Sequence, residues 1–301
     1  MKRDWISLAG SYSYEKDKFV FHGGIVKTET EEFSEFGVFL TNEIFNGGKI
    51  SVEVEFVDIS GYTSCELIVF RDPQTEALVT AGLHSFTEMY KIRRYSTRWD
   101  SIFGVGDSRN LVEGKRYLID VTVNGSVVTI NDGGVAVMSK ILPFSLKESN
   151  VGLWCMSRGN IIVHDFSVKK ENPKAFVVMQ FGDPFDKYYD DIIKVICHEH
   201  DIDVKRADEN FGAGVILSDI VQDINSSKFI IADVSPLNAN VYYEIGYAHA
   251  LNKPTILLAE RDTKLPFDIS PFRVLFYENT ITGRAKFEEG LRKHIAALVT
   301  Q

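Results

Sequence analysis

Hydrophobic and polar positions follow a strand-like pattern along nearly all of the first 168 residues. Four segments show it most clearly, by alternation or by their β-branched residues: 49–57, 65–70, 117–123 and 127–132. Turn-forming residues separate these segments, and Asn124-Gly125 predicts a hairpin whose two central residues have positive φ. Because no long amphipathic helix interrupts the pattern, the sequence predicts an all-β sandwich.

The pattern changes after residues 169–174, KKENPK, a polar stretch that predicts a linker. Beyond it, strand-like apolar runs alternate with helix-like segments, and the runs are 175–181, 202–207, 229–234, 254–259 and 273–278. Such alternation predicts a parallel sheet with right-handed crossovers. We expect the flavodoxin-like strand order 2-1-3-4-5. The chain is therefore predicted to contain an all-β domain at residues 1–170 and an α/β domain at residues 174–301.

Composition and charge limit the classes of function that the chain can have. A chain of 301 residues is long enough for two domains, and its formal charge of −9 argues against bulk affinity for nucleic acid. No run of about 18 uncharged apolar residues is present, and the first residues lack the apolar segment of a secretory signal. The three cysteines are widely separated and odd in number, which indicates neither a disulfide framework nor a zinc ribbon. We therefore expect a cytoplasmic protein that binds neither membrane nor nucleic acid.

One short segment has the residue types of a metal site, Cys197-His198-Glu199-His200. The two histidines are two positions apart on a predicted helix end, so their side chains point in different directions. No metal site is predicted there.

In the predicted sheet, the loops that follow the first and third strands should meet at the carboxyl edge, where such folds bind ligands. Gly182 lets the backbone approach a ligand closely, or it serves only the turn. Asp233 ends the third strand and either lines the crevice or caps the adjoining loop. The residues predicted to bind a substrate are Phe181, Gly182, Asp219, Asp233, Asn238, Asn240 and Tyr243.

The most informative stretch is 232–258, in which an apolar strand and a short loop precede the run Tyr243-Glu244-Ile245-Gly246-Tyr247-Ala248. Asn252-Lys253 and a further apolar strand follow it. This arrangement, together with the opening VVMQFGDPFD, resembles nucleoside 2-deoxyribosyltransferases, deoxynucleotide N-glycosidases and bacterial TIR-like domains over roughly residues 174–260.

In the transferases and glycosidases the matching glutamate attacks the anomeric carbon of a (deoxy)ribose, and in NAD-cleaving TIR enzymes a glutamate on the equivalent helix is essential. The resemblance thus implies a catalytic role for Glu244. Two positions depart from the pattern: Asn238 stands where the transferases tend to have an acidic residue, and Asp219 lies about one position from their second acidic residue.

The chemistry also suits a carboxylate at this position. An anion stabilises the oxocarbenium-like state of N-glycosidic cleavage, and a carboxylate can form a covalent ribosyl intermediate. A helix dipole favours the ionised form of an acid in the first turns by roughly 0.3–1 kcal/mol. Tyr243 and Tyr247 share a helix face and could stack on a base, or they are core aromatics. The alternative for Glu244 is a surface acid that complements the dipole.

The end of the first domain, VGLWCMSRGNIIVHDFSV (151–168), resembles the last strands of concanavalin-like jelly-roll domains, including laminin-G-like ones. The resemblance covers about 160 residues and implies a sensor, a sugar-binding module or an oligomerisation module. Trp99 and Trp154 are the candidates for stacking on a sugar, and the alternative for both is packing.

Together these patterns predict an enzyme that cleaves or transfers an N-glycosidic bond, with NAD or a (deoxy)nucleoside or nucleotide as substrate. No cofactor is expected. The resemblance to bacterial TIR-like effectors implies a defence role and a homo-oligomer, and the sandwich would bind a glycan or a protein. The alternatives are a non-catalytic nucleotide-binding or self-assembly module, and a carbohydrate-binding protein whose α/β half is structural.

Overall fold

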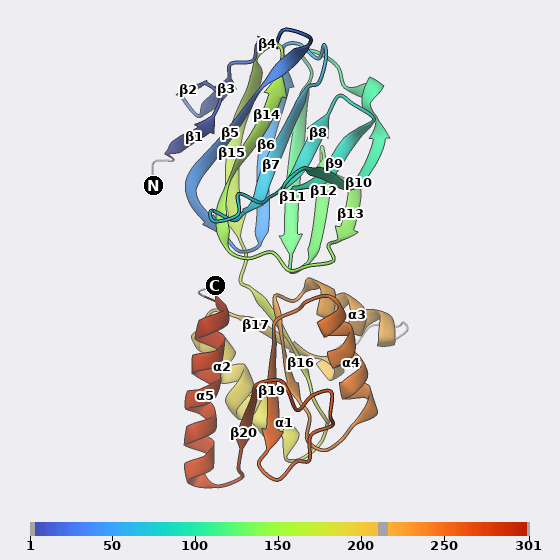
Figure 1. Ribbon diagram of the computed structural model, residues 1–301. Helices are drawn as coiled ribbons and strands as arrows, with labels where there is room; N and C mark the ends of the chain where they lie inside the picture. The colour runs from blue at the N-terminus through green and yellow to red at the C-terminus, as the bar shows by residue number, and fades with distance from the viewer. Residues whose placement is uncertain (1–3, 210–215, 300–301) are drawn as a thin grey trace. The chain divides into compact units, whose positions relative to one another are not determined.

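The computed structural model of the chain describes residues 4–209 and 216–299. The chain divides into two compact units, with the main boundary between Glu171 and Asn172. Two short segments before that boundary, 124–126 and 143–146, group with the second unit. Figure 1 shows both units, and each is described by itself below.

Within the described residues, the first unit consists of two antiparallel sheets. One sheet has the order β1-β5-β14-β7-β8-β9-β10, with β4 pairing on β5. Its strands are β1 (Trp5–Ala9), β4 (Ile25–Lys27), β5 (Glu32–Phe45), β7 (Ser64–Arg71), β8 (Leu78–His84), β9 (Glu88–Tyr95), β10 (Trp99–Asp107) and β14 (Ser149–Ser157).

The other sheet has the order β13-β12-β11-β6-β15-β3-β2. Its strands are β2 (Tyr12–Glu15), β3 (Lys18–Phe21), β6 (Gly48–Phe56), β11 (Arg116–Asn124), β12 (Val127–Asp132), β13 (Val135–Ile141) and β15 (Ile161–Lys170), and a 3₁₀ turn η1 (Ser108–Asn110) follows β10. β6 explains why this sequence forms a sandwich, because its residues alternate strictly between buried and half-buried along the strand. The predicted all-β sandwich is confirmed.

The predicted hairpin joins β11 to β12, but its turn lies one residue later than expected. Asn124 still belongs to β11, and the turn consists of Gly125 and Ser126. Gly125 has a φ of 58°, whereas neither Asn124 nor Ser126 has a positive φ. The prediction of positive φ at both central residues was therefore wrong, because the ladder extends through Asn124 and leaves one left-handed position for the glycine.

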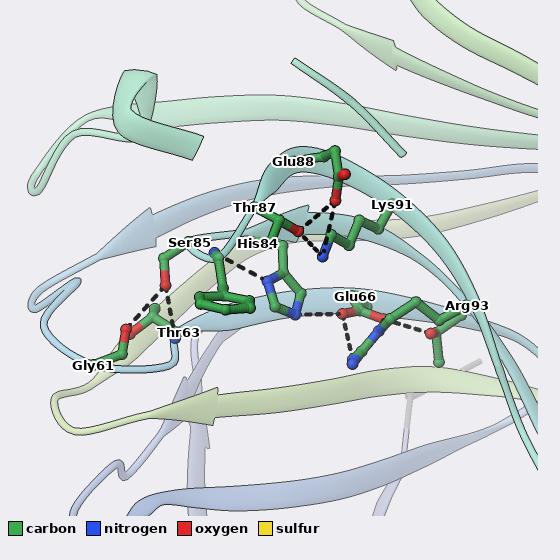
Figure 2. A network of polar contacts seen from close by, with 11 residues as sticks. Gly61, Thr63, Glu66, His84, Ser85, Thr87, Glu88, Lys91 and Arg93 are labelled. Atoms are coloured by element: carbon green, nitrogen blue, oxygen red, sulfur yellow. Dashed lines mark hydrogen bonds and ion pairs between the residues drawn. The ribbon is translucent and has the colours of Figure 1, made fainter. Parts of the chain in front are cut away.

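A buried network of charged side chains crosses β7, β8 and β9 (Figure 2). Glu66 is fully buried, on the opposite face of β7 from the core residues Cys65 and Leu67. Its carboxylate accepts hydrogen bonds from the Thr80 hydroxyl and, at 3.1 Å, from Arg93 Nε, and Arg93 Nη2 lies 2.5 Å from Oε1. The buried negative charge is thus compensated by a positive one whose side chain is 11% exposed.

His84 extends this network while remaining neutral. Its Nδ1 accepts a hydrogen bond from the backbone N–H of Phe86 at 3.2 Å, which leaves Nε2 directed at Glu66, 4.0 Å away. Burial, together with the positive charges of Arg93 and Lys91, lowers the pKa of His84 to about 3.

Trp99 and Trp154 pack against the same arginine. The Arg93 guanidinium lies 4.1 Å from the ring centre of Trp99 and 4.6 Å from that of Trp154. The two rings meet edge to face at 5.1 Å, and Trp154 is 6% exposed. Trp154 therefore takes the packing role considered for it, whereas Trp99 packs on Arg93 and Trp154 and remains half-exposed.

The second unit contains a parallel sheet in the order β17-β16-β18-β19-β20. In chain order this is 2-1-3-4-5, as predicted. The strands are β16 (Lys174–Val178), β17 (Asp203–Arg206), β18 (Phe229–Asp233), β19 (Thr255–Glu260) and β20 (Val274–Tyr277).

Helices cover both faces of this sheet. They are α1 (Phe185–Tyr188), the π-helical turn η2 (Tyr189–Ile193), α2 (Lys194–Glu199), the 3₁₀ turn η3 (Ala207–Glu209), α3 (Ile216–Ser226), α4 (Ala239–Ala250) and α5 (Ile281–Val299). One core joins α2 and α5 to one face of the sheet, and the other joins α3 and α4 to the opposite face. None of the helices in the described part of the chain is long and apolar enough to cross a membrane.

The network around Glu66 generates the first prediction. Replacing Glu66 with alanine leaves the largely buried Arg93 cation without its anionic partner, so we expect a loss of about 3–5 kcal/mol in the free energy of unfolding. Urea denaturation of the full chain measures this loss. The matched control is Glu148→Ala, at an exposed glutamate of the same unit. Equal midpoints for the two variants would contradict the prediction.

Candidate functional site

The loops after β16 and β18 meet at the carboxyl edge of the parallel sheet, as the strand order predicts. Asn238 caps the N-terminus of α4, and its Oδ1 accepts a hydrogen bond of 2.9 Å from the backbone N–H of Asn240. Its Nδ2 donates to Oε1 of Gln180, which follows β16. The side chain of Asn238 therefore ties the two loops together.

Glu244 lies in the second turn of α4, on the flank of its buried face. Val241, Ile245 and Ala248 pack on the sheet and are at most 3% exposed. Tyr247, one turn after Glu244, accepts a hydrogen bond of 3.2 Å from Asn225 of α3 through its hydroxyl. Because residues three apart on a helix are neighbours, the flank of α4 that carries Glu244 faces α3.

The Glu244 carboxylate is half-buried, and no residue in the described ranges forms an ion pair or a hydrogen bond with it. Burial alone raises the pKa of this carboxyl from 4.5 to about 7. At this position desolvation therefore outweighs the small contribution expected from the helix dipole, which favours the ionised form.

Asp219 lies in the first turn of α3 and is half-buried. Asn225 is six positions after Asp219 in the sequence, which corresponds to a rotation of about 240° around a helix. Since Asn225 contacts Tyr247, Asp219 lies on a different side of α3 from the one that faces α4. The structure does not place this second carboxylate beside Glu244.

Gly182 shapes the turn between β16 and α1. It has a φ of 91°, and a Cβ atom added to it would meet nothing within 4 Å. Its N–H donates to the Asp186 carboxylate at 3.2 Å, and its carbonyl accepts from the backbone of Phe185 at 2.9 Å. The glycine is thus needed for the left-handed turn, which corresponds to the simpler of the two roles considered.

Asp233 lies at the end of β18 and is 2% exposed. One oxygen accepts a hydrogen bond of 2.7 Å from the Tyr277 hydroxyl, and the other accepts one of 2.9 Å from the backbone of Ser235. Burial raises the pKa of Asp233 to about 7, and the same hydrogen bonds oppose the rise. The two oxygens of Asp233 thus accept hydrogen bonds from the following loop and from β20. This is the capping role considered for the residue.

Three of the predicted binding residues are exposed. Phe181 is 50% exposed and follows β16, Tyr243 is 57% exposed on α4, and Asn240 is exposed in the first turn of α4. They stand near the carboxyl edge of the sheet and are open to solvent.

Arg206 is a residue at this edge that the sequence did not reveal. It ends β17, is 5% exposed, and donates to Asp208 at 2.7 Å while Nη2 lies 2.9 Å from Asp186. The rings of Phe181 and Tyr189 lie 5.2 Å and 4.6 Å from its guanidinium. The signal that could have indicated it is a basic residue at the last position of a strand that neighbours the first strand.

Glu244 lines neither of two cavities that described residues form in the second unit. The larger, of about 530 Å³, lies between the α1–η2 segment and α5 beside the end of β20. It is lined by Pro184, Lys187, Tyr188, Asp191, Ile192, Tyr277, Glu278, Asn279, Thr280, Ile281, Arg284 and Phe287. The smaller, of about 210 Å³, is lined by residues of β16, β17 and the end of α3. In the described ranges, no group of three or more histidine, cysteine, aspartate or glutamate side chains could hold a metal ion.

Comparison with protein-family profiles and with curated proteins finds no match. Among solved structures, the chain is similar to a carbohydrate-binding module, CBM66, from Bacillus subtilis, at 11% identity over 54% of this chain and 92% of that one, with a TM-score of 0.44. A galectin, LEC-6, from Caenorhabditis elegans matches at 12% identity over 41% of this chain and 84% of that one, with a TM-score of 0.31.

A third similar structure is a 2-deoxyribosyltransferase from Bacillus psychrosaccharolyticus, at 13% identity over 42% of this chain and 95% of that one, with a TM-score of 0.33. At these identities and TM-scores, none of the three similarities identifies a function for this chain.

The partial burial of Glu244 predicts a pH-dependent effect on stability. Because the pKa in the folded state is about 7 and that of an ordinary glutamate is 4.5, the folded state holds a proton between these values that the unfolded state has lost. Glu244 therefore lowers stability progressively as pH rises through this window. We expect Glu244→Gln to raise the free energy of unfolding at pH 8 by on the order of 1–2 kcal/mol, after allowing for solvent screening of a half-buried group.

Urea denaturation at pH 8 and at pH 4.5 measures this effect, and the gain should be absent at the lower pH. The control is Glu289→Gln, because Glu289 is exposed on α5 and paired with Lys293. A gain of equal size at both pH values would show that the effect does not come from ionisation of Glu244.

The hydrogen bond between Tyr277 and Asp233 predicts a second effect on stability. Tyr277→Phe leaves one oxygen of the buried Asp233 without its donor, which should cost about 1–3 kcal/mol. Tyr243→Phe removes the hydroxyl of an exposed tyrosine and should change the unfolding free energy by less than about 0.5 kcal/mol. Thermal and urea unfolding compare the two variants, and equal stabilities would refute the assignment.

Proposed function

We propose that the second unit cleaves or transfers the N-glycosidic bond of a nucleotide, with NAD or a (deoxy)nucleoside or nucleotide as the substrate class and Glu244 as the reacting carboxylate. The proposal rests on the surroundings of the Glu244 side chain and on its position in the sequence motif. Glu244 is half-buried, it has no charged or hydrogen-bonding partner among the described residues, and it occupies the glutamate position of the Tyr243–Ala248 motif. A surface acid that only complements the helix dipole would be solvated.

The position of Glu244 supports this chemistry. A carboxylate shielded from water interacts strongly with the positive charge that develops at the anomeric carbon, and it can attack that carbon directly. A pKa of about 7 leaves about half of the carboxyls ionised at neutral pH. The same group is therefore able to act as an anion towards the sugar and to exchange a proton in that pH range.

Substrate binding is proposed at the carboxyl edge of the sheet, where α4 and the loop after β16 come together. Phe181 and Tyr243 offer exposed aromatic rings for a base, and Asn240 offers an exposed amide for sugar hydroxyls. Asp233, Gly182 and Asn238 keep the structural roles described above. Contact of these three residues and of Asp219 with a substrate is a further part of the proposal.

An assay of base release tests the enzyme hypothesis. The full chain is incubated with NAD and with a panel of nucleosides and 2′-deoxynucleosides, with and without a second free base as acceptor, and products are separated by chromatography. Wild type is expected to release or exchange a base, and Glu244→Gln to lose at least about 100-fold of that rate, because it removes the anion and keeps the shape. Glu289→Gln, at an exposed glutamate of α5, should retain the wild-type rate.

Two results would overturn the proposal. One is an equal rate for wild type and Glu244→Gln. The other is measurable binding of a nucleotide with no base release by wild type at any protein concentration, which would favour the non-catalytic nucleotide-binding alternative. Varying the concentration is necessary because self-association is part of the expectation for this class.

For the first unit we propose a recognition role towards a glycan or a protein. Its sandwich fold supports this general role. A site at Trp154 is disfavoured, since that ring is 6% exposed and packs on Arg93 and Trp99. A glycan array with the full chain tests the carbohydrate alternative.

A further inference from the structure

Two of the three cysteines, 90 positions apart in the sequence, lie directly opposite each other in the eight-stranded sheet. β14 and β7 are antiparallel neighbours in this sheet (Figure 1), and Cys155 is the register partner of Cys65. Directly opposed residues point to the same face of a sheet. Here that face is the core, since Cys65 is 3% exposed and Cys155 is fully buried.

The register of this pair gives a Cα separation of the kind that a disulfide spans. Opposed residues on antiparallel strands have Cα atoms about 4.5–5.5 Å apart, and disulfides span about 4.4–6.8 Å between Cα atoms. Both cysteines are free in this structure.

The neighbours of the pair are unreactive. In the same row across the sheet, Cys155 is opposite Gly37 on β5 and Cys65 is opposite Leu83 on β8. Glu66 follows Cys65 directly but points to the opposite face of β7. The third cysteine, Cys197, is buried in the second unit. Each of the two opposed thiols therefore has the other as its reaction partner.

We propose that Cys65 and Cys155 form a redox-sensitive pair that closes into a cross-strand disulfide when the chain folds in the presence of a disulfide oxidant such as oxidised glutathione. One cysteine thiolate attacks oxidised glutathione and releases one glutathione thiolate. The second cysteine thiolate then attacks the mixed disulfide and releases the other. Two protein thiols are oxidised, one glutathione disulfide is reduced to two glutathiones, and the two protein protons pass to the released thiolates.

The burial of the pair determines when this reaction is fast. Burial raises the pKa of the Cys155 thiol, so the attacking thiolate is rare in the folded domain. Both β7 and β14 are also inside the sheet and not at its edges. The reaction is therefore expected during folding, when the strands have paired but the core is still open, and it is slow once the sandwich is complete.

The bond would close a long loop of the first unit. The segment between the two cysteines contains the strands from β8 to β13, so the crosslink restricts the unfolded chain over about 90 residues. The sandwich folded under oxidising conditions should consequently be more stable than the same sandwich folded under reducing conditions.

Refolding of the full chain tests this. The denatured, reduced chain is refolded in a buffer of reduced and oxidised glutathione, and in parallel in dithiothreitol, and free thiols are then alkylated and counted by mass spectrometry. The oxidised sample is expected to carry one alkyl group, on Cys197, and to yield a peptide pair that links Cys65 to Cys155. Its Tm should rise by about 5–15 °C for the sandwich transition, and dithiothreitol should reverse the rise after unfolding.

Cys197→Ala is the matched control, because it removes a buried thiol from the other unit and should keep the full shift. Cys155→Ala and Cys65→Ala should each abolish it, and the count in wild type remains decisive if either variant fails to fold. Three alkylated cysteines after oxidative refolding would overturn the proposal. A stable glutathione adduct, or a disulfide that includes Cys197, would overturn it as well.

Discussion

The partial burial of the Glu244 carboxylate without a compensating charge is the constraint on which the functional interpretation depends. Taking a carboxylate out of water costs free energy unless a cation or several hydrogen-bond donors replace the lost solvent. The protein tolerates this cost because α4 is held firmly by its apolar face and by the Asn238 cap. The helix therefore fixes the carboxylate in place and leaves its oxygens available.

Three buried or half-buried carboxylates in this chain show how differently the same group can be used. Glu66 is paired with an arginine and serves the packing of the sandwich. Asp233 holds a loop and a neighbouring strand through hydrogen bonds. Glu244 has neither kind of partner among the described residues. Glu244 is therefore the one of these three carboxylates whose burial is not offset by a partner within the described ranges.

The architecture of both units could be predicted because it follows from local periodicity. The alternation in β6 and the continuous apolar runs of β16 and β18 depend on residues within one strand, and chain order then limits the topology. The hairpin turn was displaced by one residue, because the extent of the β11 ladder depends on its partner strands. Periodicity therefore predicts which elements exist more reliably than where they end.

Features that join distant segments could not be predicted in the same way. The opposition of Cys65 and Cys155 depends on the register of two strands that are far apart in the chain. The roles of Arg206 and Asp233 depend on side chains that arrive from other loops and strands. For Glu244 the motif indicated a candidate position, but its protonation balance depends on how far the folded chain excludes water from the carboxyl.

The hydrogen bond between Asn238 and Gln180 restricts which substitutions this edge of the sheet can accept during evolution. It spans two loops that a ligand at the switch point would touch, so a molecule seated between them must either accommodate the amide pair or replace its contacts. A substitution at one of the two positions leaves the other amide without its partner. Residues 180 and 238 are therefore expected to vary together among related sequences, because each amide supplies the other's hydrogen-bond partner.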